Sequence, residues 1–131
     1  MNLFSEILKL KTRLIGTDPT HPVINCTLDE SEDLEGKLPI VAIEAGTTQG
    51  EYLSTGKFDV MQHNVVMHCI VSAHEISFDS ACAAAELLAT NVMKQFIGLK
   101  IRVKPNGVDR GGLLIGSEKA REVMLDCITY E

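Results

Sequence analysis

The sequence lacks several features that identify whole classes of protein. It has no tryptophan, 5% aromatic residues and four cysteines, no two of which form a CxxC pair. Without such pairs, the usual zinc-ribbon and thioredoxin-type motifs are excluded. No run of about 18 apolar residues occurs, so we expect no membrane-spanning helix. The net charge is −6, and the basic excess typical of a free-standing nucleic-acid-binding protein is missing.

Motifs for catalysis and cofactor binding are also missing. The tetrapeptide STGK at 54–57 resembles part of a phosphate-binding loop, but the order of its residues is wrong and no helix is expected after it. The N-terminal segment carries charges among its apolar positions and has no small-residue cleavage site, so we expect no secretory signal and reduced thiols. We expect no catalytic residues and no cofactor.

The histidines and cysteines indicate structural roles. His63 and His68 have opposite parity on one expected strand, and His68 and His74 lie six residues apart, roughly 20 Å along a strand. We therefore expect partly exposed strand histidines and no metal site. Three cysteines lie in apolar or alanine-rich runs and are expected to be small buried residues: Cys69, Cys82 and Cys127.

Two segments show helical periodicity. Residues 2–15 place apolar side chains at positions 3, 7, 10 and 14, with Asn2 as a candidate N-cap and Gly16 at the expected end. Residues 79–96 place apolar side chains at 81, 85, 88, 92 and 96, with Ser77 or Asp79 as a candidate cap and Gly98 closing the helix. Both patterns predict amphipathic helices that pack on a core.

Four segments are expected to be strands: 38–45, 58–74, 99–104 and 121–131. Within 58–74, the odd positions from Val65 to Ala73 are apolar and should face the core. The even positions are mixed, and Val66 and Ile70 among them suggest a contact with another subunit. Asn106-Gly107 is a turn signal. The glycine-rich segment 46–57 is expected to be a loop or a β-arm with a short edge strand possible at 51–54, and 107–116 a loop, a further strand or an arm.

Charge gathers at two places. An expected surface loop, 16–37, contains five carboxylates within seven residues: Asp29, Glu30, Glu32, Asp33 and Glu35. Lys100, Arg102 and Lys104 alternate along an expected strand and should share one face. Each cluster is either a solvated surface or a contact surface for a partner, and the basic residues would suit an acidic partner or DNA.

These elements predict a single domain over 1–131 with an α+β two-layer architecture. The sheet should be mostly antiparallel, with the N-terminal helix and the central helix packed on one of its faces.

The order of elements resembles the tail terminator, or tail completion, proteins of long-tailed bacteriophages. The resemblance is carried by the strand LPIVAIEA, the long strand at 60–73, the helix at 79–96 and the closing residues ITYE. It implies a non-enzymatic virion protein of the tail or neck, present in the host cytoplasm during assembly. Such a protein forms a hexameric ring that caps the tail tube, stops its polymerisation and offers a joining surface to the head or neck.

The resemblance also implies partners: further copies of the chain, the tail tube protein and a neck or head-completion protein. In such a ring, the acidic loop and the basic strip are candidate partner surfaces, or the strip faces DNA passing through the lumen. Another phage connector or tail component is the nearest alternative. A second alternative is a small oligomeric enzyme or ligand-binding domain, for which the candidate residues are Glu44, His68 and Arg102.

Overall fold

The computed structural model describes residues 3–16, 24–28, 33–52 and 58–130. In chain order its elements are as follows: α1 (Leu3–Leu14), β1 (Cys26–Thr27), β2 (Ile40–Tyr52), β3 (Phe58–Ser72), α2 (Phe78–Lys94), β4 (Ile101–Ile115) and β5 (Glu118–Tyr130). The strands form one sheet in the order β1-β2-β3-β5-β4. Every pairing is antiparallel except that of β1 with β2. The predicted α+β architecture is confirmed.

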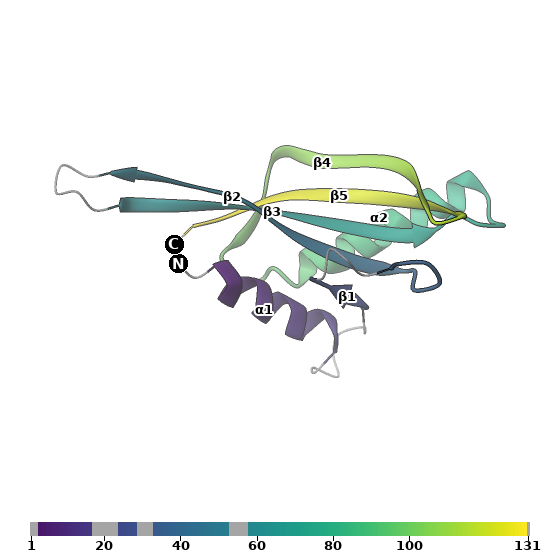
Figure 1. Ribbon diagram of the computed structural model, residues 1–131, viewed down its shortest axis with the longest axis horizontal. Coiled ribbons are helices and arrows are strands. Elements are labelled where there is room, and N and C mark those ends of the chain that lie inside the picture. The colour runs from purple at the N-terminus through teal and green to yellow at the C-terminus, as the bar shows by residue number, and fades with distance from the viewer. Residues whose placement is uncertain (1–2, 17–23, 29–32, 53–57, 131) are drawn as a thin grey trace.

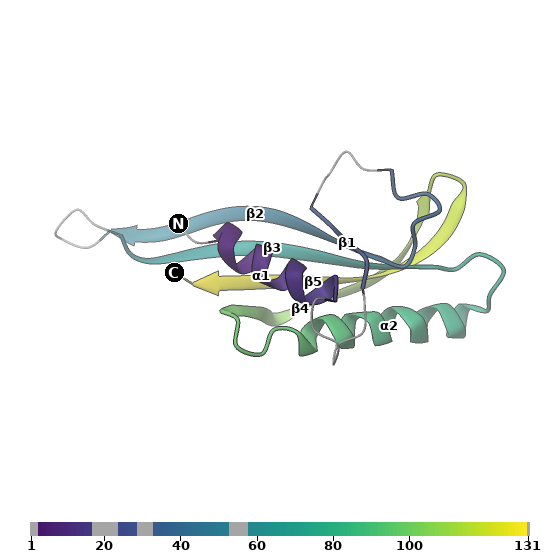
Figure 2. The ribbon, with the colours of Figure 1, turned by 90° about the horizontal axis from the view of Figure 1, so that it is seen from below.

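Both helices lie against the same face of the sheet, as the view from below shows (Figure 2). The core between the layers is mostly apolar, and its largest buried side chains include Leu10, Leu14, Met67, Ile101 and Leu125. The odd positions of β3 from Val65 to Val71 are buried in this core, as the alternation predicted. We call this the covered face of the sheet.

The helix ends follow the expected local chemistry. The Ser77 hydroxyl accepts a hydrogen bond from the backbone N–H of Ser80 at 3.2 Å, which caps α2. Gly16 follows α1 with φ of +82°, the left-handed conformation that commonly ends a helix. The expectation that Gly98 closes α2 is wrong, because the helix ends at Lys94 with Gln95 as its C-cap and Gly98 lies in the turn that follows. At the other end of α2, the Arg13 guanidinium donates to the carbonyl oxygens of Gln95 (2.9 Å) and Ile97. That contact pins α1 to the C-terminus of α2. The candidate N-cap Asn2 lies outside the described residues.

The predicted turn at Asn106-Gly107 is wrong. These residues lie within β4, where the four residues 104–107 stand opposite the single residue Asp126 of β5. Asn106 has φ of +58°, and a Cβ on Gly107 would lie 2.8 Å from the Asp126 carbonyl oxygen. The segment is therefore a bulge, and the turn between β4 and β5 falls at Gly116 and Ser117. An Asn-Gly pair supplies the positive φ that either a turn or a bulge requires.

Both glycine-rich segments belong largely to strands. Residues 46–52 extend β2 along β3, and residues 107–115 lie in β4 and pair with β5. Gly46 sits at a bulge in β2, where an added Cβ would lie 3.1 Å from the Asn64 carbonyl oxygen. Residues 53–57 lie outside the described part of the chain.

The long hairpin of β2 and β3 extends past the rest of the sheet (Figure 1). Pairing of β3 with β5 ends at Gln62 opposite Tyr130, whereas pairing with β2 continues to Phe58 opposite Tyr52. We call residues 50–52 and 58–61 the hairpin arm. They pair only with each other in the described structure.

Three smaller expectations need correction. The expected loop 16–37 contains the short strand β1, held in parallel by β2. His63 is buried on the covered face, with its Nδ1 2.8 Å from the Thr48 hydroxyl, whereas a partly exposed position was expected. Cys82 is only half-buried, because its side chain lies beside the buried stripe of α2 and not within it.

Candidate functional site: the open face of the sheet

The face of the sheet opposite the helices is polar and apolar in alternating patches. It is formed by the even positions of β3 and β5, together with Ala42 and Glu44 of β2. One end is covered by the chain itself, because Leu34 and Leu38 pack against a small cluster of Ile40, Ile70 and Ala120. Ile70 is therefore buried within the subunit, which contradicts the expectation that it contacts another copy.

The other end of this face is uncovered in the described structure, and we call it the open face. It presents the half-buried apolar side chains Val66, Met124 and Ile128 next to ionisable groups. A solvated sheet face is normally polar at these positions. The apolar side chains therefore give the open face the character of a contact surface.

A Glu–His–Glu cluster lies at the centre of the open face. His68 of β3 stands between Glu44 of β2, whose Oε2 is 3.0 Å from Nε2, and Glu122 of β5, whose Oε2 is 3.2 Å from Nδ1. Both ring nitrogens thus face a carboxylate, an arrangement that an imidazolium satisfies by donating two hydrogen bonds. The hydrogen bond to Glu122, followed by that to Glu44, raises the pKa of His68 above its ordinary 6.5, although partial burial opposes the shift.

The register of the strands creates this cluster. Ala42 and Met124 are the residues directly opposite His68, so the two glutamates reach it diagonally, one from each neighbouring strand. Glu44 and His68, two of the three candidates for an enzyme or binding site, are thus brought together. Glu122 was not anticipated, because it lies 54 positions from His68 and no local pattern in the sequence connects them.

The third candidate, Arg102, is not part of the cluster. It stands opposite Ile128, four positions along β5 from the residue opposite His68. Its Nη1 donates to the carbonyl oxygens of Leu99 and Ile101 at 2.7 and 2.9 Å. The guanidinium is therefore engaged with its own segment.

The predicted basic strip is divided by the structure. Lys100 precedes β4, and its backbone N–H donates to Glu6 Oε2 of α1 at 3.3 Å. Arg102 is the only one of the three in the regular part of the strand. Lys104 lies in the bulge and forms an ion pair with Asp126 at 3.2 Å. The three residues do not form one free charged row, because Lys100 lies outside β4 and the side chains of Arg102 and Lys104 are engaged with neighbouring groups.

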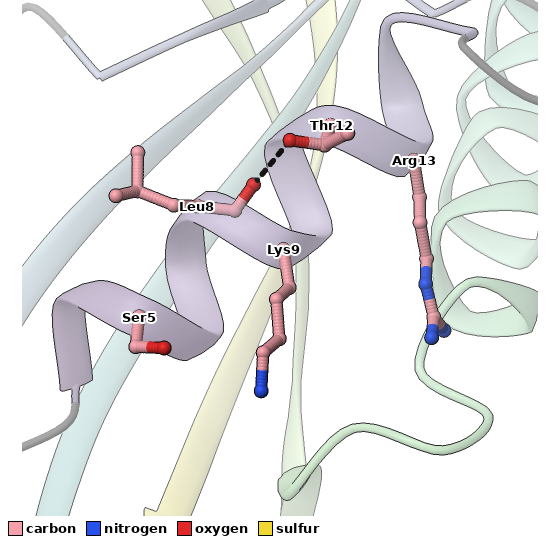
Figure 3. Close-up of a pocket in the computed structure, with 5 residues that line it drawn as sticks. All are labelled: Ser5, Leu8, Lys9, Thr12 and Arg13. Atoms are coloured by element: carbon pink, nitrogen blue, oxygen red, sulfur yellow. Dashed lines mark hydrogen bonds between the residues drawn. The ribbon is translucent and has the colours of Figure 1, made fainter.

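A different basic surface forms around the junction of the two helices. Along α1, Leu8, Lys9 and Arg13 line a shallow hollow, and Arg13 reaches toward the connection that follows α2 (Figure 3). That connection carries Lys94, Ile97 and Lys100, all exposed, and Ile97 is 79% exposed. We call Lys9, Arg13, Lys94, Lys100 and Ile97 the basic patch. Its one described carboxylate, Glu6, is buried and bonded to Lys9.

The acidic loop is described only in part. Asp29, Glu30 and Glu32 lie outside the described residues. Asp33 accepts a hydrogen bond from the backbone N–H of Glu35 at 3.0 Å, and Glu35 accepts one from the Ser117 hydroxyl at 3.3 Å. This part of the loop is therefore attached to the β4–β5 turn, at the opposite end of that hairpin from Lys100.

The described residues offer little for nucleophilic or metal chemistry. Burial raises the pKa of the Cys69 and Cys127 thiols to about 12 and that of Cys26 to about 11, which leaves them as thiols at neutral pH. No group of three His, Cys, Asp or Glu side chains in the described ranges is arranged to hold a metal ion. None of the described helices has the length and apolar character needed to cross a bilayer.

Comparison with known proteins assigns no family. No protein-family model matches the chain, and no curated protein matches it significantly.

Proposed function

We propose that this chain is a structural subunit of a phage tail, a tail terminator that forms a hexameric ring on the end of the tail tube. In this role it stops tube polymerisation and provides the surface that joins the head or neck. Its partners are further copies of the chain, the tail tube protein and a neck or head-completion protein, and DNA passes through the lumen of the ring. The proposal begins from the resemblance in element order and closing residues.

The observation that carries the proposal is the hairpin arm. A subunit that caps a polymer needs an element that reaches beyond its own body to a neighbour or to the tube. The arm extends beyond Tyr130, the last residue of β5, and in the described structure its strands pair only with each other. The open face supports the same role, because a ring subunit needs contact surfaces in addition to its own core.

The direct test measures mass and tube growth. Light scattering of the protein alone, over a range of concentrations, should give a particle mass near six subunits. Added to growing tubes, the protein should sit at one end and halt elongation. A protein that stays monomeric in solution and neither binds nor stops tubes would contradict the proposal.

The same experiment separates the nearest alternative. Another neck connector or tail component would form a similar ring but would leave the length of the tubes unchanged. Co-sedimentation with purified tubes, followed by end-specific imaging, therefore distinguishes a terminator from a connector.

A second candidate function rests on the Glu44–His68–Glu122 cluster. An imidazole between two carboxylates can exchange a proton or bind a small cationic ligand, so a small enzyme or ligand-binding domain is the competing proposal. A thermal-shift screen of metabolites tests it. Strong stabilisation by one compound, abolished in His68→Gln, would favour this candidate over the structural one.

A further inference from the structure

We propose that the open face of one subunit docks on the basic patch of a second copy, so that the ring grows by head-to-tail contacts between two different surfaces of the same chain. This inference rests on the proposed ring and deepens it by naming the two surfaces that meet.

Charge complementarity is the first argument. The open face presents Glu44 and Glu122 around the titratable His68, while Asp126 is paired with Lys104. On β4, Asp109 stands opposite Met124 and Arg102 stands opposite Ile128, so carboxylates still outnumber permanent cations on this face. The basic patch presents four cations and one buried carboxylate. Because each chain carries a net charge of −6, copies repel one another unless opposite charges face each other at the contact.

The apolar side chains supply the second argument. Val66, Met124 and Ile128 are half-buried on the open face, and Ile97 protrudes from the basic patch with Leu8, 48% exposed, on the adjoining helix. A protruding apolar anchor with charges around it suits a sheet face on which apolar side chains surround a charged centre. The open face and the basic patch therefore match in charge and in apolar character.

The position of the two surfaces supplies the third argument. The basic patch lies at the junction of the helices, on the covered side of the sheet, and the open face lies on the opposite side. One molecule cannot bring its own two surfaces together. A contact between different surfaces leaves one of each free on every pair, so further copies add, and the assembly closes into a ring when the rotation between neighbours divides a full turn.

Two double variants test the inference, each designed to remove one surface. Glu44→Lys/Val66→Lys changes the open face at two residues that stand opposite each other in β2 and β3. Lys94→Ser/Lys100→Ser removes two exposed lysines of the basic patch, and it adds no negative charge that the new lysines of the first variant could bind. Glu75→Lys and Lys119→Glu reverse exposed charges elsewhere and serve as controls. Circular dichroism and thermal unfolding first establish that each variant is folded.

Each double variant should raise the concentration needed for assembly by at least about tenfold, and the controls should assemble as the wild type does. An equimolar mixture of the two double variants should then form a two-subunit species and nothing larger. Each variant retains the surface that the other has lost, so one contact forms and no second contact is available.

The outcomes separate this inference from the proposed function. If the wild type forms rings and both double variants do so equally well, the head-to-tail contact is wrong and the ring stands. If a mixture of folded, monomeric variants forms no dimer at a tenfold higher concentration, the contact is also wrong. A wild type that never assembles, with or without tubes, overturns both.

Discussion

The covered and open faces of the sheet are made of alternate residues of the same strands, yet they differ in almost every physical respect. On β5, Val123, Leu125 and Cys127 are buried beneath the helices, whereas Met124, Asp126 and Ile128 are half-buried on the open face. The covered face contributes apolar burial, which is the main stabilising term in folding. The open face holds the ionisable cluster and contributes little to that core. The covered face therefore stabilises the fold, whereas the side chains of the open face are available for contacts with other molecules.

Substitutions at two neighbouring positions of β5 should show the largest difference in stability between the two faces. Leu125→Ala removes a fully buried side chain and should lower the free energy of unfolding by about 2–5 kcal/mol. Met124→Ala, one residue away on the open face, should cost less than about 1 kcal/mol in the monomer, because its side chain is already half solvated. Urea unfolding of both variants measures the difference. Equal losses of unfolding free energy would mean that the covered face and the open face contribute equally to stability.

The bulge of β4 gives the next largest expected effect. Gly107→Ala would place a methyl group 2.8 Å from the Asp126 carbonyl oxygen and 3.0 Å from that of Lys104, both backbone atoms that cannot move independently. We expect a loss of about 1–3 kcal/mol. Gly111→Ala is the matched control, because no atom lies within 4 Å of an added Cβ there. A similar loss of stability at both positions would show that the cost comes from replacing any glycine in the strand, and not from the close contact at the bulge.

The pH dependence of stability should come from the open face. The pKa of His68 is raised in the folded chain by Glu122 and Glu44, so its stabilising contribution is fully present below pH 6.5. It is lost as the pH rises through the higher folded value. The effect should stay below about 1 kcal/mol, since Glu44 is 53% exposed and screened by water. Unfolding midpoints between pH 6 and 9 should fall for the wild type more than for His68→Gln. Parallel curves for the two proteins would argue against the cluster as the source.

Assembly through the open face should show the opposite trend. A neutral His68 leaves Glu44 and Glu122 uncompensated, so the surface becomes more attractive to the cations of the basic patch as the pH rises. Of the other charged groups near this part of the face, Asp126 and Lys104 are paired with each other and Arg102 donates to backbone carbonyls of its own segment. Asp109 stands opposite Met124 on β4 and adds a further negative charge. As the pH rises, we expect the subunit to lose folding stability and to assemble more readily. One pH titration that follows both quantities would therefore show that His68 affects folding and assembly in opposite directions.

The smallest expected effect is at Lys104. Its ion pair with Asp126 is partly exposed, and Lys104→Met should change the free energy of unfolding by about 0.5 kcal/mol or less. Denaturant titration at low and high salt checks this. A loss well above 1 kcal/mol would mean that the pair helps to hold the bulge.

Periodic patterns predicted the parts of this fold that depend on local geometry. The stripes of α1 and α2, and the buried row from Val65 to Val71, follow from the spacing of apolar residues alone. The parity of His63 and His68 also placed them correctly on opposite faces. Each of these features repeats within one helix or one strand, where sequence spacing determines direction.

The features that sequence spacing missed depend on pairing between distant segments. Glu122 reaches His68 only through the register of β5 on β3. The basic strip is not a free charged row, because Lys104 is paired with Asp126 of the neighbouring strand β5. Ile70 was expected to be free because nothing in the sequence places Leu34 and Leu38 above it. The even positions of β3 already indicated a contact face, but the Glu44–His68–Glu122 cluster on it could be recognised only once the strands were paired.

The hairpin arm has a mechanical consequence because its β3 half is continuous with the central strand of the sheet. A pull along the arm is transmitted directly into β3, whose bonds to β5 run from Gln62 to Ser72 and lie across the direction of the load. A pull on the arm moves β2 and β3 together, so the backbone hydrogen bonds between β3 and β5 are sheared at the same time, whereas a peeling force would break them one after another. A tether at the arm is therefore anchored in the sheet itself, and tension along it is resisted by the β3–β5 pairing as a whole.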